Sequence, residues 1–436
     1  MGKKSRLKKL KKEYQSAGEA IPAPKSFLLN ENIQKLIASA LLVIFLAIGI
    51  VLRLSNIGVN GRSPDEGVYT YQAKSTASDG IDGIRRMIRE YNADPKAWIY
   101  PPPIRAGYIY LLAWTMRATN TFDVQAGTYL STICSIGSLC ILALLGMRFF
   151  NRWVAVAALL LMSVSPMDLA IARRSWQDSA LAFFVTVLVY CCCELTADPR
   201  RKAWYIPFWL IGSYCIIIKE SGIVAYGLCV IWLLAVAALR ERSFLKSVLL
   251  IIFTAAGTML SVFVLGQVVG GFSHILEILK HVKDAMPTNT YAIDYQTGPW
   301  YRILEGLWIL TPAGVVLCSA GMTSLFSKLA AKNDIAKGLA FFITAFLCIT
   351  ILTPYCQNIR YLSVIFVPFY LMCGFGVWSI ISYLRPYFKG PAFGAAVAII
   401  VCILIAVSVR DYKKFQRVFV ETGIRDISVR LVREAS

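Results

Sequence analysis

Long apolar runs separated by short polar loops make up most of this 436-residue chain. Several runs are long enough to cross a hydrocarbon core of about 30 Å. A run in lipid has to be helical, because its backbone finds no water to bond. We therefore predict an all-α, polytopic transmembrane protein with about eleven spans, within a range of about 10–13. The predicted spans cover residues 36–52, 124–147, 153–168, 178–195, 203–218, 222–239, 247–268, 301–323, 338–354, 361–384 and 391–409.

The basic residues predict how the chain is threaded. Nine Lys and Arg residues precede the first apolar run, from Lys3 to Lys35, and such segments stay on the cytoplasmic side. We therefore predict a basic cytoplasmic N-terminal segment (1–35), a transmembrane domain (36–409) and a basic C-terminal tail (410–436). An odd number of spans places this tail outside.

Two segments are predicted to lie on the outer side, at about 54–122 and 270–300. Residues 81–91 place apolar side chains at i, i+3, i+7 and i+10, with basic residues between them. This pattern is typical of an amphipathic helix in the plane of the interface. Residues 104–116 are apolar but short, and we predict a second interfacial helix there rather than a span.

Composition agrees with the pattern. The chain is 57% hydrophobic and 16% charged, whereas soluble domains are about 25% charged. The net charge of +20 resides in loops and tails, so we predict no nucleic-acid partner. The cysteines lie mostly in apolar runs without a CxxC spacing, and His274 and His281 best fit a solvated interfacial helix. No cofactor and no metal site are predicted, although the sequence leaves a divalent metal open.

Adjacent acids follow the first span. Asp65 and Glu66 stand in the segment 62–67, which also contains an Arg, a Pro and a Gly. A carboxylate in a partly dry pocket near a basic group can act as a general base. Pro, Asp and Gly are also turn residues, and from spacing alone a plain turn is favoured.

A second polar segment lies at an outer junction of two predicted spans. Arg173 and Asp178 flank the entry to the fourth span, where they could meet Asp65 and Glu66. An Arg there can hold a phosphate or orient a carboxylate. A local ion pair, with the Arg reaching to the interface, is an equally good interpretation.

Further basic and aromatic residues lie at predicted outer boundaries. Arg105 follows the rigid run Pro101-Pro102-Pro103, Lys219 stands at an outer turn, and Arg360 and Tyr361 begin the tenth span. Each could contact a lipid phosphate. Each is favoured somewhat more, taken alone, as an anchor at the interface.

Together these segments resemble the GT-C membrane glycosyltransferases that use polyprenyl-phosphate sugars. The branch is that of the protein O-mannosyltransferases and aminoarabinose transferases (glycosyltransferase families 39 and 83). The resemblance covers about residues 35 to 385 and rests on the order and spacing of four motifs. They are Asp65-Glu66 after the first span, Pro101-Pro102-Pro103, Arg173 five residues before Asp178-Ser179, and Arg360-Tyr361-Leu362 before Pro368.

The resemblance implies a donor sugar on dolichyl or undecaprenyl phosphate, transferred with inversion to a hydroxyl of a protein, lipid or glycan. Asp65 would be the base and Glu66 would orient the acceptor or support Asp65. Arg173 and Asp178 would complete the site. Candidate phosphate ligands would be Arg105, Lys219 and Arg360, with Tyr361 beside them. By analogy, the site would face outward from a plasma membrane, among membrane lipids.

Three departures accompany the resemblance. Ile99-Tyr100 occupies the place where the aminoarabinose branch has a Lys, the segment 270–300 is too short for a sugar-binding domain, and a Trp-Trp-Asp motif is absent. The alternatives are a secondary transporter or lipid flippase, and a non-catalytic assembly subunit. A transporter would place charges near the bilayer midplane, whereas here they stand at outer boundaries.

Overall fold

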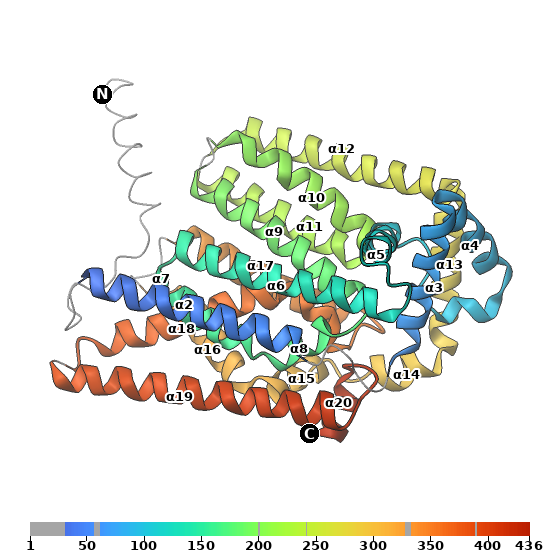
Figure 1. The fold of residues 1–436 in the computed structure, drawn as a ribbon. Helices are drawn as coiled ribbons and strands as arrows, with labels where there is room; N and C mark the ends of the chain where they lie inside the picture. Colours follow the sequence, from blue (N-terminus) through green and yellow to red (C-terminus); the bar gives the residue numbers. More distant parts are fainter. Residues whose placement is uncertain (1–30, 56–61, 199–200, 241, 328–332, 389) are drawn as a thin grey trace.

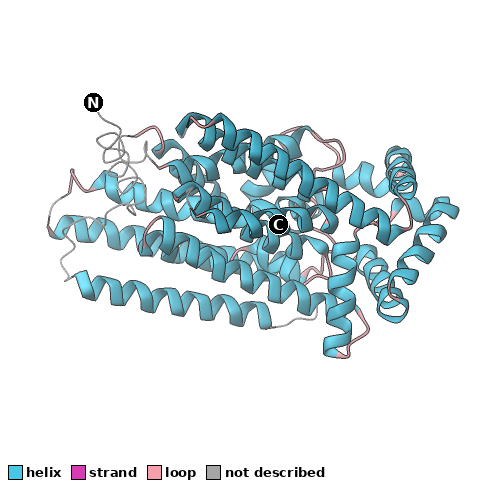
Figure 2. Ribbon diagram, turned by 90° about the horizontal axis from the view of Figure 1, so that it is seen from above, coloured by secondary structure: helices cyan, strands magenta, loops and turns pink. Residues whose placement is uncertain are grey.

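The structure is a computed structural model that describes residues 31–55, 62–198, 201–240, 242–327, 333–388 and 390–436. Helices joined by short loops account for nearly all of the described chain (Figures 1 and 2). Within these residues, β-structure is limited to an isolated antiparallel bridge between Asn358 and Ser428. The predicted all-α class is confirmed. Most of the predicted N-terminal segment, residues 1–30, lies outside the described residues.

The α-helices, in chain order, are α2 (Glu31–Leu54), α3 (Pro64–Asp79), α4 (Ile81–Ala93), α5 (Ala106–Thr119), α6 (Val124–Phe149), α7 (Arg152–Ser163), α8 (Pro166–Ala172), α9 (Gln177–Ala197), α10 (Tyr205–Ile218), α11 (Ser221–Ala235), α12 (Phe244–Val269), α13 (Phe272–Ala285), α14 (Thr290–Gln296), α15 (Arg302–Leu310), α16 (Pro312–Ser324), α17 (Asp334–Leu352), α18 (Phe366–Leu384), α19 (Pro391–Phe415) and α20 (Val429–Ala435). Short 3-10 or π segments are η1 (Pro95–Ile99), η2 (Lys202–Trp204), η3 (Val236–Arg240), η4 (Met286–Thr288), η5 (Ile359–Ile365) and η6 (Gln416–Glu421).

The protein is a multi-pass membrane protein. Among the described residues, 8 helices are long and apolar enough to cross a bilayer, and counting two bent helix pairs raises the number to 10. Adding the shorter apolar helix Lys202–Ile218 accounts for each predicted span.

The predicted spans 153–168 and 301–323 each correspond to a pair of helices with a bend between them. The pair α7–α8 bends by 60° and the pair α15–α16 by 109°. Helices α8 and α16 begin at Pro166 and Pro312. Proline lacks the N–H that would continue the preceding helix.

Burial separates central from peripheral spans. In the most apolar 18-residue stretch of each span, 83% of the residues are buried in Ile359–Leu384, but only 11% in Phe244–Val269 and in Pro391–Glu421. Small residues let central helices approach closely: a Cβ on Gly376 of α18 would lie 2.0 Å from the Leu317 carbonyl oxygen of α16. Glycines at such a contact allow packing of backbone against backbone in lipid.

Short helices gather at one end of the bundle. Figure 1 shows α3, α4, α13 and α14 beyond the ends of the long helices, with α5 seen end-on beside them. Helix α4 buries Ile84, Met87 and Ile88 against other parts of the protein, including Leu265 of α12 and Ile278 of α13. The amphipathic helix is as predicted, and its place in the plane of the interface stays a prediction. Helix α5 has 14 residues and is not among the candidate spans of the described chain. This end of the bundle carries the predicted site residues.

Candidate active site

The first turn of α3 presents Asp65 and Glu66. Ser63 is the N-cap and Pro64 is the first helical residue, an arrangement typical of helix N-termini. The Ser63 N–H donates to Glu66 Oε2 over 2.8 Å, as in a capping box. Successive helical side chains point about 100° apart, so the two acids have different surroundings. Glu66 is fully buried, whereas the Asp65 side chain is 27% exposed.

Glu66 ties α3 to the loop before α9. Its Oε1 accepts from the Ser175 N–H at 2.9 Å and from Arg62 Nη1 at 3.0 Å. Its Oε2 accepts from Arg174 Nη1 at 3.2 Å in addition to Ser63. Four donors leave this carboxylate little capacity for another partner. Glu66 therefore fixes the place of α3 and, through it, of Asp65.

Asp65 faces an arginine from a distant part of the chain. Arg360 Nη2 of η5 donates to Asp65 Oδ2 over 3.0 Å. The guanidinium of Arg360 lies 5.1 Å from the centre of the Trp176 ring and 5.4 Å from that of Tyr361. Arg360 is only 7% exposed, so this ion pair has water on one side only, that of Asp65. The structure thus brings together two predicted site residues.

Asp178 forms a second ion pair nearby. Lys219 Nζ donates to Asp178 Oδ1 over 2.6 Å and lies 4.4 Å from the centre of the Tyr361 ring. Both side chains are buried, and Asp178 Oδ2 has no hydrogen-bond partner among the described residues. Tyr361 lies between Lys219 and Arg360, and so connects the two ion pairs.

Arg105 forms the third pair, with two partners that the sequence analysis did not single out. Its Nε and Nη2 donate to the two carboxylate oxygens of Glu220 over 3.1 and 3.0 Å. Its Nη1 donates to the hydroxyl of Tyr69, which lies one turn beyond Asp65 on α3. Burial raises the pKa of Tyr69, Arg105 opposes this shift, and the Asp65 carboxylate adds to it. Tyr69 therefore stays neutral beside Asp65.

The three cations lie close enough to influence one another. Burial lowers the pKa of Lys219 below 10.5, the positive charges of Arg105 and Arg360 lower it further, and Asp178 opposes the shift. Like charges are costly together unless an anion is shared between them. Arg105, Lys219 and Arg360 thus form a group of three neighbouring cations, which we call the cation cluster, and each of them is paired with at least one acid.

The predicted residue Arg173 lies apart from this cluster. Its Nη2 donates to the Leu52 carbonyl over 2.7 Å, and its guanidinium lies 4.7 Å from the centre of the Phe415 ring. The neighbouring Arg174 is the residue that reaches Glu66. The two arginines point different ways from one turn, and no signal in the sequence distinguishes them. Tyr69, by contrast, could have been found from its i+4 spacing to Asp65.

The C-terminal tail returns to the site. The Ile359 N–H donates to the Ile427 carbonyl over 3.2 Å, beside the bridge from Asn358 to Ser428. Asp426 accepts hydrogen bonds from Asn358 and from Tyr291, and its Oδ1 lies 3.8 Å from Arg360 Nη1. Arg360 thus lies between two acids, Asp65 and Asp426. No motif in the tail pointed to this role.

The described residues include no group of three or more His, Cys, Asp or Glu side chains arranged to hold a metal ion. The carboxylates at the site are each paired with a cation instead.

Comparison with known proteins gives structural matches only. No protein-family model matches the chain, and no curated protein sequence matches it. ArnT from Cupriavidus metallidurans in the apo state gives a TM-score of 0.55 at 15% identity, covering 91% of this chain and 77% of that one. The structure of ArnT bound to undecaprenyl phosphate, from the same organism, gives a TM-score of 0.59 at 13% identity. That match covers 87% of this chain and 71% of ArnT. This chain has a GT-C-like fold.

A second GT-C structure agrees. The archaeal oligosaccharyltransferase AglB from Archaeoglobus fulgidus, in complex with an inhibitory peptide and a dolichol-phosphate, gives a TM-score of 0.61 at 12% identity. The match covers 91% of this chain and 56% of AglB, so the chain spans little more than half of that protein. The GT-C-like fold predicted from the four motifs is confirmed, while identities this low leave the function to be argued from the site.

Proposed function

We propose that this protein is a membrane glycosyltransferase that moves a sugar from a polyprenyl-phosphate donor to a hydroxyl acceptor on the extracytoplasmic side. One observation carries the proposal. The partly exposed carboxylate of Asp65 faces the cation cluster of Arg105, Lys219 and Arg360 at one end of a GT-C-like bundle. A base opposite an anion site is what this transfer requires.

The reaction needs one proton acceptor and one stabilised leaving group. The acceptor oxygen attacks the anomeric carbon as Asp65 takes its proton, which is general base catalysis. The bond from the anomeric carbon to the phosphate oxygen breaks, and its electron pair leaves with the polyprenyl phosphate. Attack opposite the leaving group inverts the anomeric carbon. Arg105, Lys219 and Arg360 stabilise the charge that develops on the phosphate.

Donor binding also prepares the base. Arg360 is hydrogen-bonded to Asp65 at 3.0 Å, so one oxygen of the carboxylate is occupied by the guanidinium in that pair. A lipid phosphate entering the cation cluster competes for Arg360 and frees an Asp65 oxygen for the acceptor. Asp178 and Tyr361 keep Lys219 in place for the same phosphate.

Two predicted residues act from further away in this proposal. Glu66 supports Asp65 by fixing the start of α3. Arg173 completes the site by holding the turn before α9 against α2, through its hydrogen bond to Leu52. Both are positioning residues rather than groups that touch the substrate.

The donor class has further support. ArnT is matched in a complex with undecaprenyl phosphate, and AglB in one with a dolichol-phosphate. The alternative function is a secondary transporter or lipid flippase. Such proteins place ionisable residues near the bilayer midplane, whereas Asp65, Arg105 and Lys219 lie outside the spans, at one end of the bundle. This placement favours chemistry at the membrane surface.

A transfer assay tests the proposal. Purified protein in nanodiscs is incubated with a panel of undecaprenyl- and dolichyl-phosphate hexoses and pentoses, and release of polyprenyl phosphate is measured. We expect turnover with at least one donor, loss of turnover in Asp65→Asn, and unchanged turnover in Asp284→Asn, an exposed acid of α13. Equal rates for Asp65→Asn and wild type would remove Asp65 as the base. Transport of an intact lipid-linked sugar without release of the phosphate would favour the alternative.

Sidedness is tested separately. A single cysteine at position 65 is probed in intact cells with an impermeant thiol reagent, with and without permeabilisation of the membrane. We expect position 65 to be labelled from outside. Labelling only after permeabilisation would contradict the extracytoplasmic site.

A further inference from the structure

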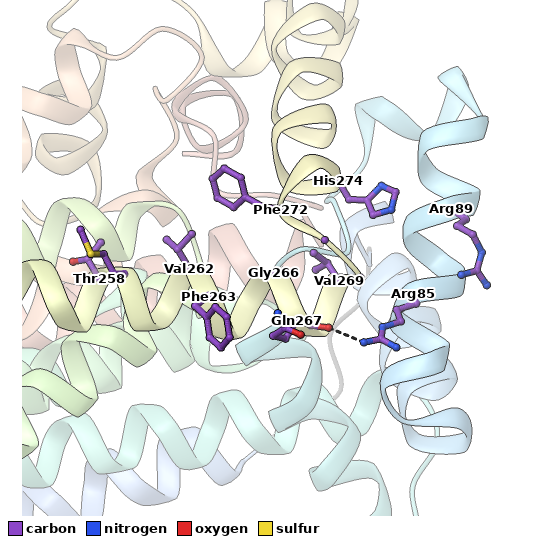
Figure 3. Close-up of a pocket in the computed structure, with 13 residues that line it drawn as sticks. Arg85, Arg89, Thr258, Val262, Phe263, Gly266, Gln267, Val269, Phe272 and His274 are labelled. Atoms are coloured by element: carbon purple, nitrogen blue, oxygen red, sulfur yellow. Dashed lines mark hydrogen bonds between the residues drawn. The ribbon is translucent and has the colours of Figure 1, made fainter.

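A large groove lies apart from the active site. Its volume is about 820 Å³, and it is enclosed by α12, the start of α13 and the neighbouring face of α4 (Figure 3). Figure 3 shows Arg85 and Arg89 of α4 beside His274 of α13, with Phe263 of α12 and Phe272 further along. None of the residues assigned to the active site lines this groove.

One end of the groove is cationic. Arg85 Nη2 donates to the Gln267 carbonyl over 2.8 Å, which holds the guanidinium over the end of α12. Arg85 Nε is buried without a hydrogen-bond partner in the described chain. Arg85 Nη1 lies 3.9 Å from Oδ1 of Asp82, in a long ion pair that leaves Nε unused. Arg89 follows one turn later on the same face, and its guanidinium makes no ion pair with any acid among the described residues. Two guanidinium groups therefore have unused donors at the groove.

Arg86, on the same helix, forms a short ion pair and a side-chain hydrogen bond within the protein. Its Nη2 lies 2.6 Å from Asp79 Oδ2, and it also donates to Ser75 Oγ. Arg86 does not line the groove. On α4, therefore, the arginines with unused guanidinium donors are the two that line the groove, and the arginine that does not line it has its partners within the protein.

The other end of the groove is apolar and open. It runs along α12, a candidate span in which only 11% of the residues of the most apolar 18-residue stretch are buried. Met259 is 71% exposed and Phe263 is 63% exposed, and both point to the surroundings of the bundle rather than to its core. Such side chains suit lipid tails, and basic side chains next to an apolar surface suit the headgroup of a lipid.

We propose that this groove binds an anionic glycerophospholipid of the leaflet that contains α4. Its phosphate accepts hydrogen bonds from Arg85 and Arg89, and one acyl chain lies along Met259 and Phe263 of α12. The arginines bind the phosphate, and their positive charges favour a headgroup with a net negative charge over a zwitterionic one that carries the same phosphate. The open apolar wall selects an amphiphile over a free phosphate ion. The site is separate from the proposed donor site and does not depend on the proposed function.

A binding experiment tests both halves of the groove. Purified protein is titrated with phosphatidylglycerol in phosphatidylcholine nanodiscs, and bound lipid is counted by native mass spectrometry. We expect preferential binding of phosphatidylglycerol, reduced about tenfold or more in Arg85→Gln/Arg89→Gln, because charge-assisted hydrogen bonds are lost. Arg86→Gln is the matched control and should bind as wild type does.

The apolar half has its own variant pair. A Cβ on Gly266 would have only the Phe272 backbone nitrogen nearby, at 3.9 Å, and one on Gly227 of α11 would meet nothing within 4 Å. Gly266→Leu therefore fills the groove without a clash, whereas Gly227→Leu places the same side chain elsewhere. We expect Gly266→Leu to weaken binding of phosphatidylglycerol and Gly227→Leu to leave it unchanged.

Three results would overturn the proposal. The first is equal binding of phosphatidylglycerol by wild type and both groove variants. The second is displacement of the lipid by inorganic phosphate at equal concentration, which would make the apolar wall irrelevant. The third is displacement by undecaprenyl phosphate together with loss of sugar transfer in Gly266→Leu, which would assign the groove to the donor. Loss of transfer alone, with lipid binding intact, would concern only the proposed function.

Discussion

Arg360 hydrogen-bonds to Asp65 across 295 positions of sequence, with Nη2 and Oδ2 3.0 Å apart. The contact joins the first helix after the first span to the start of one of the last spans. Because the carboxylate of Asp65 is the proposed base, its arginine partner sets when that base is free. The contact predicts that Arg360 has more than one role, as a phosphate ligand and as a partner of the base.

Substitution of Arg360 tests this double role. Arg360→Gln should lower turnover by about 10²-fold or more, the usual cost of removing one transition-state donor. Arg360→Lys should recover little, because an ammonium lacks the fork that reaches both Asp65 and a phosphate. Turnover is measured by release of polyprenyl phosphate. Full activity of Arg360→Gln would exclude both roles.

Glu66 should matter for stability more than its neighbour does. Its buried carboxylate pairs with Arg62 and Arg174, and removing one partner of a buried pair costs about 3–5 kcal/mol. Glu66→Gln should therefore lower the thermal unfolding temperature in detergent. Asp65→Asn, at a partly exposed position, should leave it nearly unchanged while it abolishes transfer. Equal unfolding temperatures for the two variants would contradict the assignment of Glu66 as an anchor.

Arg173 and Arg174 provide a second matched pair. Arg174 reaches Glu66, whereas Arg173 reaches Leu52 and the Phe415 ring. We expect Arg174→Gln to impair both stability and transfer, and Arg173→Gln to act mainly on stability. If Arg173→Gln instead kept its unfolding temperature and lost turnover, Arg173 would act in the chemistry.

The charge of Lys219 predicts a dependence on pH. Burial lowers its pKa below 10.5, with help from Arg105 and Arg360. The Lys219 side chain is protonated and positively charged at a pH below that lowered pKa, and it loses the charge as the pH rises through the pKa. The KM for donor should therefore rise at alkaline pH, starting below 10.5, and Lys219→Arg should delay the rise, because Arg keeps its charge. An alkaline limb that does not move in Lys219→Arg would assign it to another group.

The tail can be tested with a conservative change. Asp426 accepts from Asn358 and Tyr291 and lies 3.8 Å from Arg360. Asp426→Asn keeps the size of the side chain but removes the charge that shares Arg360 with Asp65. We expect turnover to fall about tenfold, in line with the loss of a charge-assisted hydrogen bond, with little change in unfolding temperature. Unchanged turnover would show that the contact between Asp426 and Arg360 has only a structural role.

Much of this architecture could be read from the sequence, because lipid imposes strict rules. Apolar runs have to be helices there, so the position of each span followed from the pattern. The amphipathic stripe of residues 81–91 likewise predicted α4. The broken spans were missed although Pro166 and Pro312 mark both breaks. In those two places the hydropathy continues across the break, and only the missing N–H of proline marks it.

Most residues of the site could be predicted from the sequence, but the ion pairs between them could not. Order along the chain placed Asp65, Asp178 and Arg360 at one end of the bundle. The pairing of cations with acids depends on how α9, α10 and η5 pack against one another. The hydropathy of the sequence does not predict this packing. Glu220 and Asp426 were missed for the same reason, since each acquires meaning only through Arg105 or Arg360.

Because the tail returns to η5, the site is complete only if all of the spans have inserted into the membrane in the right order. Asp426 follows all of the candidate spans in the described chain, and it meets Arg360 only if those spans have crossed in the intended order. A chain with one span left out would deliver its tail to the opposite face of the membrane. It would keep most of its helices, yet Arg360 would lack its second acid and η5 its bridge to Ser428. Activity would then belong only to molecules whose biogenesis has finished correctly.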